Sequence, residues 1–185
     1  PLDHLRLQRL RVGRRGDGQG RAAGGEFDWL DGGGAIDRFL NHNIAVIVDL
    51  HDELHKNDFN TSATFRSNFQ AFWGNLATNL KTYDPNKVFF ELVNEPDFSG
   101  NPGTWQTYQQ SLVNTVRAAA PNHTIIATGA NYGGTFGLTQ LTPVNDDNVV
   151  YSFHFYEPFA FTHQGADYVG DPAYVDLRNL PWPAN

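Results

Sequence analysis

The feature that most constrains the fold is a repeated alternation of helix-like segments and short apolar runs. In three segments, apolar residues recur three and four positions apart, as in a helix that buries one face. Continuous apolar runs follow these segments at residues 44–50, 88–93 and 124–128, and a fourth run covers 149–156. Such runs are typical of strands buried on both faces, so the pattern predicts a parallel sheet with helical crossovers, either doubly wound or closed as a barrel.

The helical segments have readable boundaries. The first ends near residues 41–43, and the second covers 65–80 and stops before the Asp-Pro-Asn sequence at 84–86. The third is predicted to begin with Thr104 as its N-cap and to end before Pro121.

The composition is that of a globular chain. Its 185 residues suffice for one domain with a substantial core, but a complete eight-stranded α/β barrel typically has ~250. No run of about 18 apolar residues occurs, which excludes a transmembrane helix, and no secretory leader is recognisable. Because cysteine is absent, neither disulfides nor thiolate metal sites are expected.

Charge is unevenly distributed along the chain. The formal net charge is −7, yet six of the ten arginines lie in the first 21 residues, which are also rich in glycine. Residues 1–25 allow three interpretations: a flexible Arg-Gly arm, an aberrant start of a domain, or ordinary disorder. We therefore separate this segment from a domain spanning residues 26–185. The acidic body argues against a nucleic-acid surface and suits a neutral or cationic partner.

Polar or small residues lie at the carboxyl end of each predicted strand. They are His51, Glu95, Gly129 and the pair His154 and Tyr156. Both α/β barrels and open α/β sheets build their active sites at this edge. No Gly-x-Gly-x-x-Gly or P-loop motif follows a run, which weakens a nucleotide-binding interpretation.

Glu95 is the candidate general acid. Alternation along the strand would place it on the same face as Phe89, Glu91 and Val93. A glutamic acid in a partly apolar site can donate a proton near neutral pH, and Pro96 would fix the turn after it. The alternative is a solvated loop glutamate.

His51 has more than one interpretation. His51 and His55 are four residues apart, as two zinc ligands on a helix would be, but Asp52 stands where a zinc protease has its glutamate, and we expect no metal. The preferred role of His51 is to donate to a substrate hydroxyl or to orient a carboxylate. A hydrogen-bonded core histidine remains the alternative.

His154 and Tyr156 would share one face of the fourth strand. Phe153 and Phe155 would then point the other way, toward helices. A His and a Tyr beside a carboxylate could tune its charge and hold a sugar ring, whereas the alternative is a pair of polar core residues.

Aromatic rings bind sugars by stacking on their apolar faces. The candidates for this role are Trp105, Tyr132 and Trp182. Trp105 also fits a helix core, and burial is the preferred interpretation for it.

Four segments resemble glycoside hydrolase family 5, the cellulase-type retaining β-glycosidases with a (β/α)8 barrel. The matching stretches are IAVIVDLH, VFFELVNEP, TIIATGANYGG and VVYSFHFYEPFAFTHQGA. They spread over about residues 27–170 and correspond to strands 3 to 6 of the family barrel. The resemblance implies an α/β fold of the (β/α)8 TIM-barrel type, about half to two-thirds complete.

The resemblance also implies roles for individual residues. Glu95 would be the acid/base, and Asn94 would bind the sugar 2-hydroxyl. His51, at the end of strand 3, would bind substrate together with His154 and Tyr156 at the end of strand 6. Family members act without cofactors on β-1,4-glucans and on related mannans or other β-glycans.

The chain departs from the family pattern at its start and in one loop. Asp52 follows His51 where many relatives have a second histidine. Residues 1–25 contain no recognisable first strand, and Arg11 with Val12 is the nearest trace of the second.

The nucleophile is the largest departure. The sequence stops before a seventh strand with a Gly-Glu-Phe type nucleophile, so the second carboxylate is expected to be missing from this chain. The nearby acids Asp52, Glu53 and Glu157 do not occupy the family position of that nucleophile.

We therefore expect a secreted endo-β-1,4-glucanase, a cellulase that degrades cellulose, or part of one. A non-catalytic β-glucan-binding remnant is the alternative, and an RNA-binding arm at residues 1–25 is disfavoured by the acidic body. The expected partner is a β-glucan polysaccharide or oligosaccharide, without nucleic acid or membrane. Open sheet edges are aggregation hazards, so a homodimer that covers the open barrel is expected.

Overall fold

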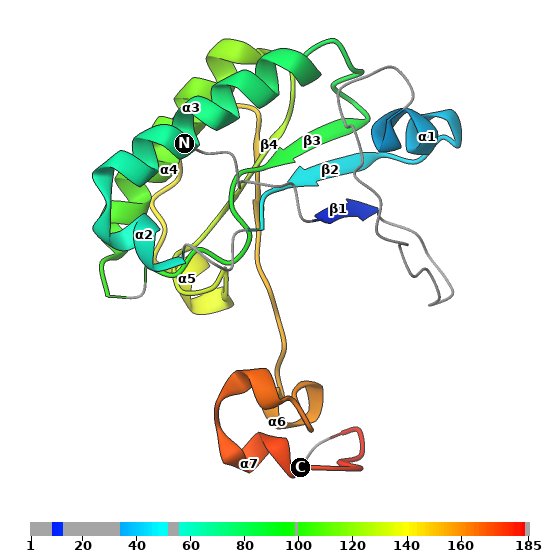
Figure 1. The fold of residues 1–185 in the computed structure, drawn as a ribbon, viewed down its shortest axis with the longest axis vertical. Coiled ribbons are helices and arrows are strands. Elements are labelled where there is room, and N and C mark those ends of the chain that lie inside the picture. The colour runs from blue at the N-terminus through cyan, green and yellow to red at the C-terminus, as the bar shows by residue number, and fades with distance from the viewer. Residues whose placement is uncertain (1–8, 13–33, 52–55, 99, 184–185) are drawn as a thin grey trace. The chain divides into compact units, whose positions relative to one another are not determined.

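The computed structural model describes residues 9–12, 34–51, 56–98 and 100–183 (Figure 1). The chain divides into two compact units, Pro1–Phe153 and His154–Asn185. The predicted boundary between residues 25 and 26 lies outside the described residues. None of the described helices is long and apolar enough to cross a membrane.

The first unit contains a five-stranded sheet in the order β1-β2-β3-β4-β5. The strands are β1 (Arg9–Val12), β2 (Val46–Asp49), β3 (Val88–Glu91), β4 (Ile125–Thr128) and β5 (Val149–Ser152). Strands β2 to β5 pair in parallel. Four parallel strands with intervening helices confirm the predicted fold class, a partial (β/α)8 barrel.

Strand β1 was not predicted. It contains Arg11 and Val12, in the segment where no clear strand was expected, and it pairs with β2 antiparallel, with Arg11 opposite Ile47. A barrel strand would run parallel to its neighbour, so this pairing departs from barrel geometry.

The helices of the first unit follow the predicted alternation. They are α1 (Ala35–Asn41), α2 (Lys56–Thr61), α3 (Ala63–Leu80), α4 (Pro102–Ala119) and α5 (Thr135–Thr139). The second unit contains only short helical segments among its described residues: α6 (Phe159–Thr162), η1 (Asp167–Val169) and α7 (Pro172–Val175). The short helices α2 and α5 were not predicted.

The N-caps of the two long helices are hydrogen-bonded side chains. Ser62 caps α3 by accepting from the backbone N–H of Phe65 at 3.1 Å. Helix α4 begins three residues earlier than predicted, because Pro102 occupies its first turn and Asn101 accepts from the N–H of Thr104 at 3.3 Å. The prediction of Thr104 as the N-cap was therefore wrong.

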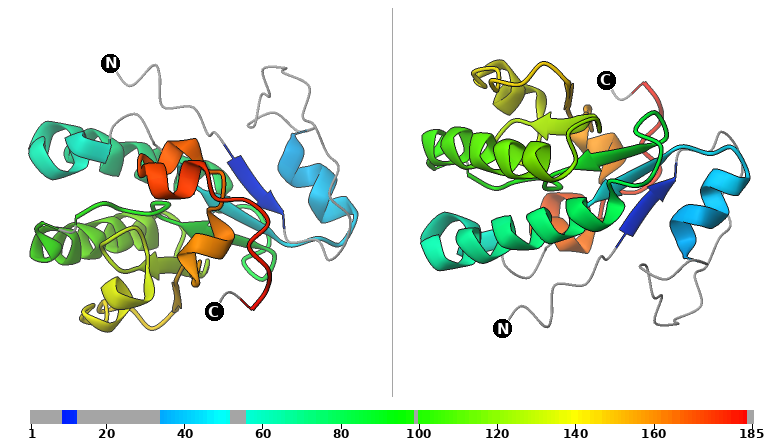
Figure 2. Two further views of the ribbon diagram at one scale, coloured as in Figure 1. Left: turned by 90° about the horizontal axis from the view of Figure 1, so that it is seen from below. Right: turned by 90° about the horizontal axis from the view of Figure 1, so that it is seen from above.

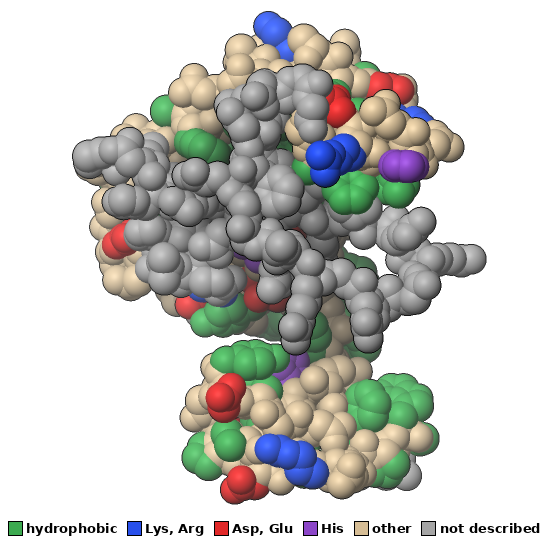
Figure 3. All heavy atoms as spheres, turned by 45° about the vertical axis from the view of Figure 1, so that its right-hand side comes forward, with side chains coloured by type: hydrophobic (Ala, Val, Ile, Leu, Met, Phe, Trp, Pro, Cys, Tyr) green, Lys and Arg blue, Asp and Glu red, His purple; other side chains and the backbone are tan. Residues whose placement is uncertain are grey.

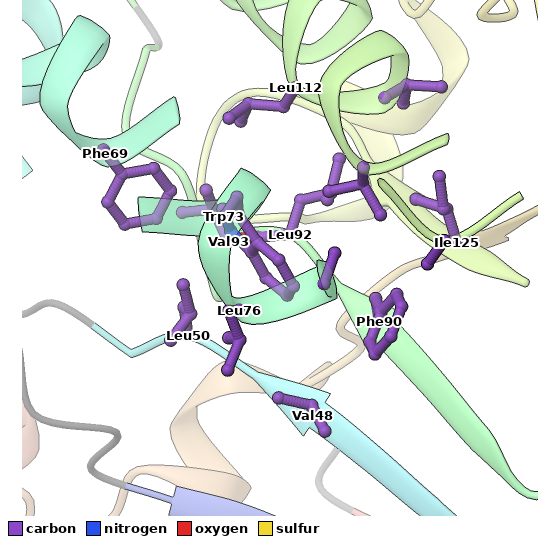
Figure 4. Packing of buried hydrophobic residues seen from close by; sticks show 14 of the residues in the cluster. Val48, Leu50, Phe69, Trp73, Leu76, Phe90, Leu92, Val93, Leu112 and Ile125 are labelled. Carbon is purple, nitrogen blue, oxygen red and sulfur yellow. The ribbon is translucent and has the colours of Figure 1, made fainter. Parts of the chain in front are cut away.

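The core lies between one face of the sheet and helices α3 and α4, which run side by side in both views of Figure 2. Figure 4 shows Val48 and Leu50 beside Leu76 of α3, and Trp73 of the same helix beside Leu92 and Val93. Trp73 is completely buried. Trp73 does not belong to the apolar stripe predicted for residues 65–80, but it is adjacent to it on the helix. The buried face of a helix is wider than one line of residues.

Strands β2, β3 and β4 share one burial pattern. The first and third residues of each are fully buried against the helices, whereas the second is partly exposed on the opposite face. The fourth residue belongs to that opposite face by alternation, and it is polar in each strand: Asp49, Glu91 and Thr128. The pattern thus carries a polar group to the carboxyl end of each strand.

The predicted fourth strand is shorter than its apolar run. Strand β5 ends at Ser152, and the side chains of Phe153 and Phe155 are 52% and 64% exposed. The prediction that both rings face helices was therefore wrong, because the alternation of the strand ends before them.

Candidate active site

The polar residues at the strand ends contact one another across the sheet. Ser152 Oγ donates to Glu91 Oε1 at 3.1 Å, although β4 lies between their two strands. Thr128 Oγ1 donates to the backbone oxygen of Ser152 at 3.1 Å. The carboxyl edge of the sheet is thus lined by hydrogen-bonded polar groups on the face opposite α3 and α4.

Asn94 and Glu95 follow β3 at this edge. The N–H of Asn94 donates to the Leu50 oxygen at 2.9 Å, which ties the segment after β3 to the segment after β2. Asn94 is buried and Glu95 is partly exposed. Asn94, Glu95 and His51 therefore lie at the same edge.

Glu95 has an unusual backbone conformation. Its φ is +46°, a left-handed value that costs a non-glycine residue on the order of 1–3 kcal/mol. Because β3 ends at Glu91, the predicted alternation does not extend to Glu95, and that prediction was wrong. The turn is fixed by Pro96, which is buried and whose oxygen accepts from the Tyr132 N–H at 3.0 Å.

Two indole groups hold the strand ends from the helix side. Trp73 Nε1 donates to the Leu92 oxygen and Trp105 Nε1 to the Thr128 oxygen, both at 2.8 Å. Gln109 Oε1 accepts from the Thr128 N–H at 2.9 Å. These side chains bond backbone groups at the strand ends that no neighbouring strand reaches. Trp105 is buried in α4, which confirms the preferred interpretation of this residue.

A rigid loop after β4 presents Tyr132. Gly129 and Gly137 close the loop by backbone contact, since a Cβ on Gly129 would lie 2.2 Å from the carbonyl carbon of Gly137. The Tyr132 ring is 48% exposed, and its hydroxyl donates to Asp97 Oδ2 at 2.9 Å. Lys56 Nζ lies 5.3 Å from the ring centroid. The predicted role of Tyr132 in stacking on a sugar stays a prediction.

His51 is paired with a buried carboxylate. Its Nε2 lies 2.6 Å from Asp49 Oδ2. Asp49 was not a predicted site residue, although strand alternation puts positions 49 and 51 on the same face and was the signal available. Among the described residues, no three His, Asp or Glu side chains form a group that could hold a metal ion. His55 lies outside the described residues.

His154 and Tyr156 belong to the second unit, where they form an aromatic cluster. Their ring centroids are 6.0 Å apart, and the Tyr156 ring lies 5.2 Å from that of His163. His163 stacks on Phe159 with 3.7 Å between centroids. Sequence reasoning missed His163, although its segment FTHQG directly follows the predicted site pair.

The surface of the described residues carries charges of both signs. On the face shown in Figure 3, acidic and basic side chains are interspersed. Large apolar side chains are also exposed in the second unit: Phe155, Tyr156, Tyr168 and Trp182. Trp182 is 64% exposed and packs against Phe161, with 5.3 Å between ring centroids.

Comparison with curated proteins shows related glucanases. Endoglucanase 3 of Fibrobacter succinogenes is 32% identical over 149 residues, which cover 77% of this chain and 22% of the relative. Endoglucanase C of Acetivibrio thermocellus is 32% identical over 167 residues, which cover 83% of this chain and 47% of the relative. The chain thus spans less than half the length of these relatives.

Solved structures give the same relationship. The cellulose synthase subunit Z of Clostridioides difficile matches with a TM-score of 0.71 at 29% identity, over 81% of this chain and 48% of that one. Thermotoga maritima Cel5A in complex with mannotriose matches with a TM-score of 0.66 at 30% identity, over 72% of this chain and 42% of that one. The family model for Cellulase (glycosyl hydrolase family 5) matches residues 33–180. The chain therefore belongs to glycosyl hydrolase family 5.

Proposed function

We propose that this chain forms the acid/base half of a glycoside hydrolase site that cleaves β-1,4-glucan. The observation that carries the proposal is the position of Glu95, which is partly exposed at the carboxyl edge of a parallel sheet. Membership of family 5 and the endoglucanase relatives support the reaction class.

In the proposed reaction, Glu95 donates a proton to the glycosidic oxygen as the bond to the sugar carbon breaks. A positioned general acid contributes roughly 10²–10⁴-fold to a rate. The strained turn at Glu95 and the bond from the Asn94 N–H to the Leu50 oxygen fix the backbone that carries Glu95. Asn94 and His51 would bind hydroxyl groups of the sugar.

The proposal places no nucleophile among the described residues. Retaining glycosidases need a second carboxyl group only ~5–5.5 Å from the acid. The buried acids at the strand ends are Asp49, which holds His51, and Glu91, which accepts from Ser152. We propose that neither attacks the sugar and that a carboxylate outside the described residues completes the pair.

Hydrolysis of carboxymethyl cellulose by the chain and by Glu95→Gln tests the proposal. Loss of the acid should lower the rate by about 10²-fold or more. Asp147→Asn, which neutralises an exposed acid, is the matched control and should be unaffected. Equal, measurable rates for the chain and Glu95→Gln would remove Glu95 from the mechanism.

A second candidate function is β-glucan binding without cleavage. The exposed, fixed ring of Tyr132 favours it, because such a ring can stack on a sugar whether or not a nucleophile is present. Calorimetry with cellotetraose and with mannotetraose would show heat of binding without product formation. Absence of heat with both sugars would argue against this candidate.

We also propose that the protein is secreted, because the proposed substrate, cellulose, is too large to enter a cell. Detection of the protein in the culture medium of its source would support this location. Retention inside cells would contradict it.

A further inference from the structure

Asp49 and His51 form a buried hydrogen-bonded pair at the carboxyl end of β2. His51 Nε2 lies 2.6 Å from Asp49 Oδ2, and the two side chains are 10% and 1% exposed. The other carboxylate oxygen, Asp49 Oδ1, is buried and has no hydrogen-bond partner among the described residues. Within that part of the chain, His51 is thus the sole side chain bonded to this carboxylate.

The geometry decides which ring nitrogen carries the hydrogen. A nitrogen and an oxygen 2.6 Å apart need a hydrogen between them. A carboxylate removed from water requires a donor, so the hydrogen belongs to Nε2 and Asp49 accepts it. In a neutral imidazole only one nitrogen carries hydrogen, which leaves Nδ1 of His51 as an acceptor.

The pair lies beside the proposed acid. Leu50 faces the core under α3, so strand alternation puts Asp49 and His51 on the opposite face of the sheet. The Leu50 oxygen accepts from the Asn94 N–H at 2.9 Å, which places His51 next to the segment that carries Glu95. A sugar bound at Glu95 would therefore lie within reach of His51.

We infer that Asp49 is a positioning residue, which fixes the Nε2–H form of His51 so that Nδ1 accepts a hydrogen bond from a sugar hydroxyl. The part that concerns sugar rests on the proposed function. It reverses the direction of one of the two roles expected from the sequence, in which His51 donates to a substrate hydroxyl or orients a carboxylate. The site would thus require a ligand group that donates a hydrogen bond to Nδ1 of His51.

The test is nitrogen NMR of the chain labelled with ¹⁵N-histidine, with His51→Gln used to assign the His51 signals. At pH 7.5 the wild-type ring should be in the Nε2–H form. In Asp49→Asn the new amide can donate to Nε2, so the ring should shift toward the Nδ1–H form. A wild-type ring in the Nδ1–H form would overturn the inference, even if the variant failed to fold.

Affinity for cellotetraose tests the sugar contact separately. Asp49→Asn should weaken binding about three- to tenfold, the size of one neutral hydrogen bond, while Asp147→Asn should not. Unchanged affinity in a variant whose ring has changed form would overturn the contact with sugar. If the wild-type chain neither binds nor cleaves β-glucan, the proposed function fails, whereas the NMR result still decides the role of Asp49.

Discussion

Replacing Trp73 with phenylalanine should destabilise the first unit by about 2–4 kcal/mol. The indole N–H donates to the Leu92 oxygen at 2.8 Å in a fully buried setting. Phenylalanine cannot donate, and an unsatisfied buried acceptor costs about 1–3 kcal/mol. The smaller ring also leaves unfilled space, which adds about 1 kcal/mol.

Urea denaturation followed by far-ultraviolet circular dichroism measures this loss. Trp182→Phe is the matched control, because Trp182 is 64% exposed and does not belong to the buried core. The control should change the free energy of unfolding by no more than about 0.5 kcal/mol. If both variants shifted the unfolding midpoint equally, the indole of Trp73 would not anchor the strand end that leads to Glu95.

Three other predictions concern the loop after β4, acid stability and assembly. Gly129→Ala should lower the melting temperature, because the added Cβ would lie 2.2 Å from the backbone of Gly137. The control Gly134→Ala should be tolerated, because the nearest atom to its Cβ would lie at 3.4 Å. Equal melting temperatures for the two variants would refute the backbone contact. Burial and then the charge of Arg117 lower the pKa of His123 from 6.5, so the stability it contributes is complete above about pH 6.5 and is lost as the pH falls below that value. Urea midpoints at pH 7.5 and 5.5 should show this loss in the wild type and a smaller one in His123→Gln, and equal losses would contradict it. Finally, we propose that the chain self-associates, so light scattering should give twice the mass of one chain, and a strictly monomeric elution would argue against the dimer.

The strands and long helices could be predicted because their signals are local. The run at residues 44–50 is apolar without interruption, and β2 lies inside it. The apolar stripe at 65–80 gives α3 within two residues at its start. Boundaries were less certain where two capping groups compete, as at Asn101 and Thr104.

The parts that could not be predicted depend on contacts between distant residues. Arg117 binds both carboxylate oxygens of Asp146, 29 positions away, at 2.8 and 2.9 Å, and this bond lowers the pKa of Asp146. Neither residue has a local signal for the other. The bond from Ser152 to Glu91 spans 61 positions and is likewise invisible in the sequence.

In the candidate site, too, the features that depend on adjacent residues could be predicted and those that depend on distant contacts could not. The Asn-Glu-Pro motif identified Glu95 from three adjacent residues. Its left-handed backbone was not readable, because it depends on how Pro96 contacts the loop at Tyr132. The roles of His154 and Tyr156 as substrate-binding residues stay predictions.

A crystal structure of Glu95→Gln with cellotetraose tests the central proposal most directly. It predicts a glycosidic oxygen within about 2.6–3.2 Å of the side chain at position 95, with sugar hydroxyls beside Asn94 and His51. Sugar bound at another place, with the carboxyl edge of the sheet empty, would contradict the proposal that this edge is a glycoside hydrolase site.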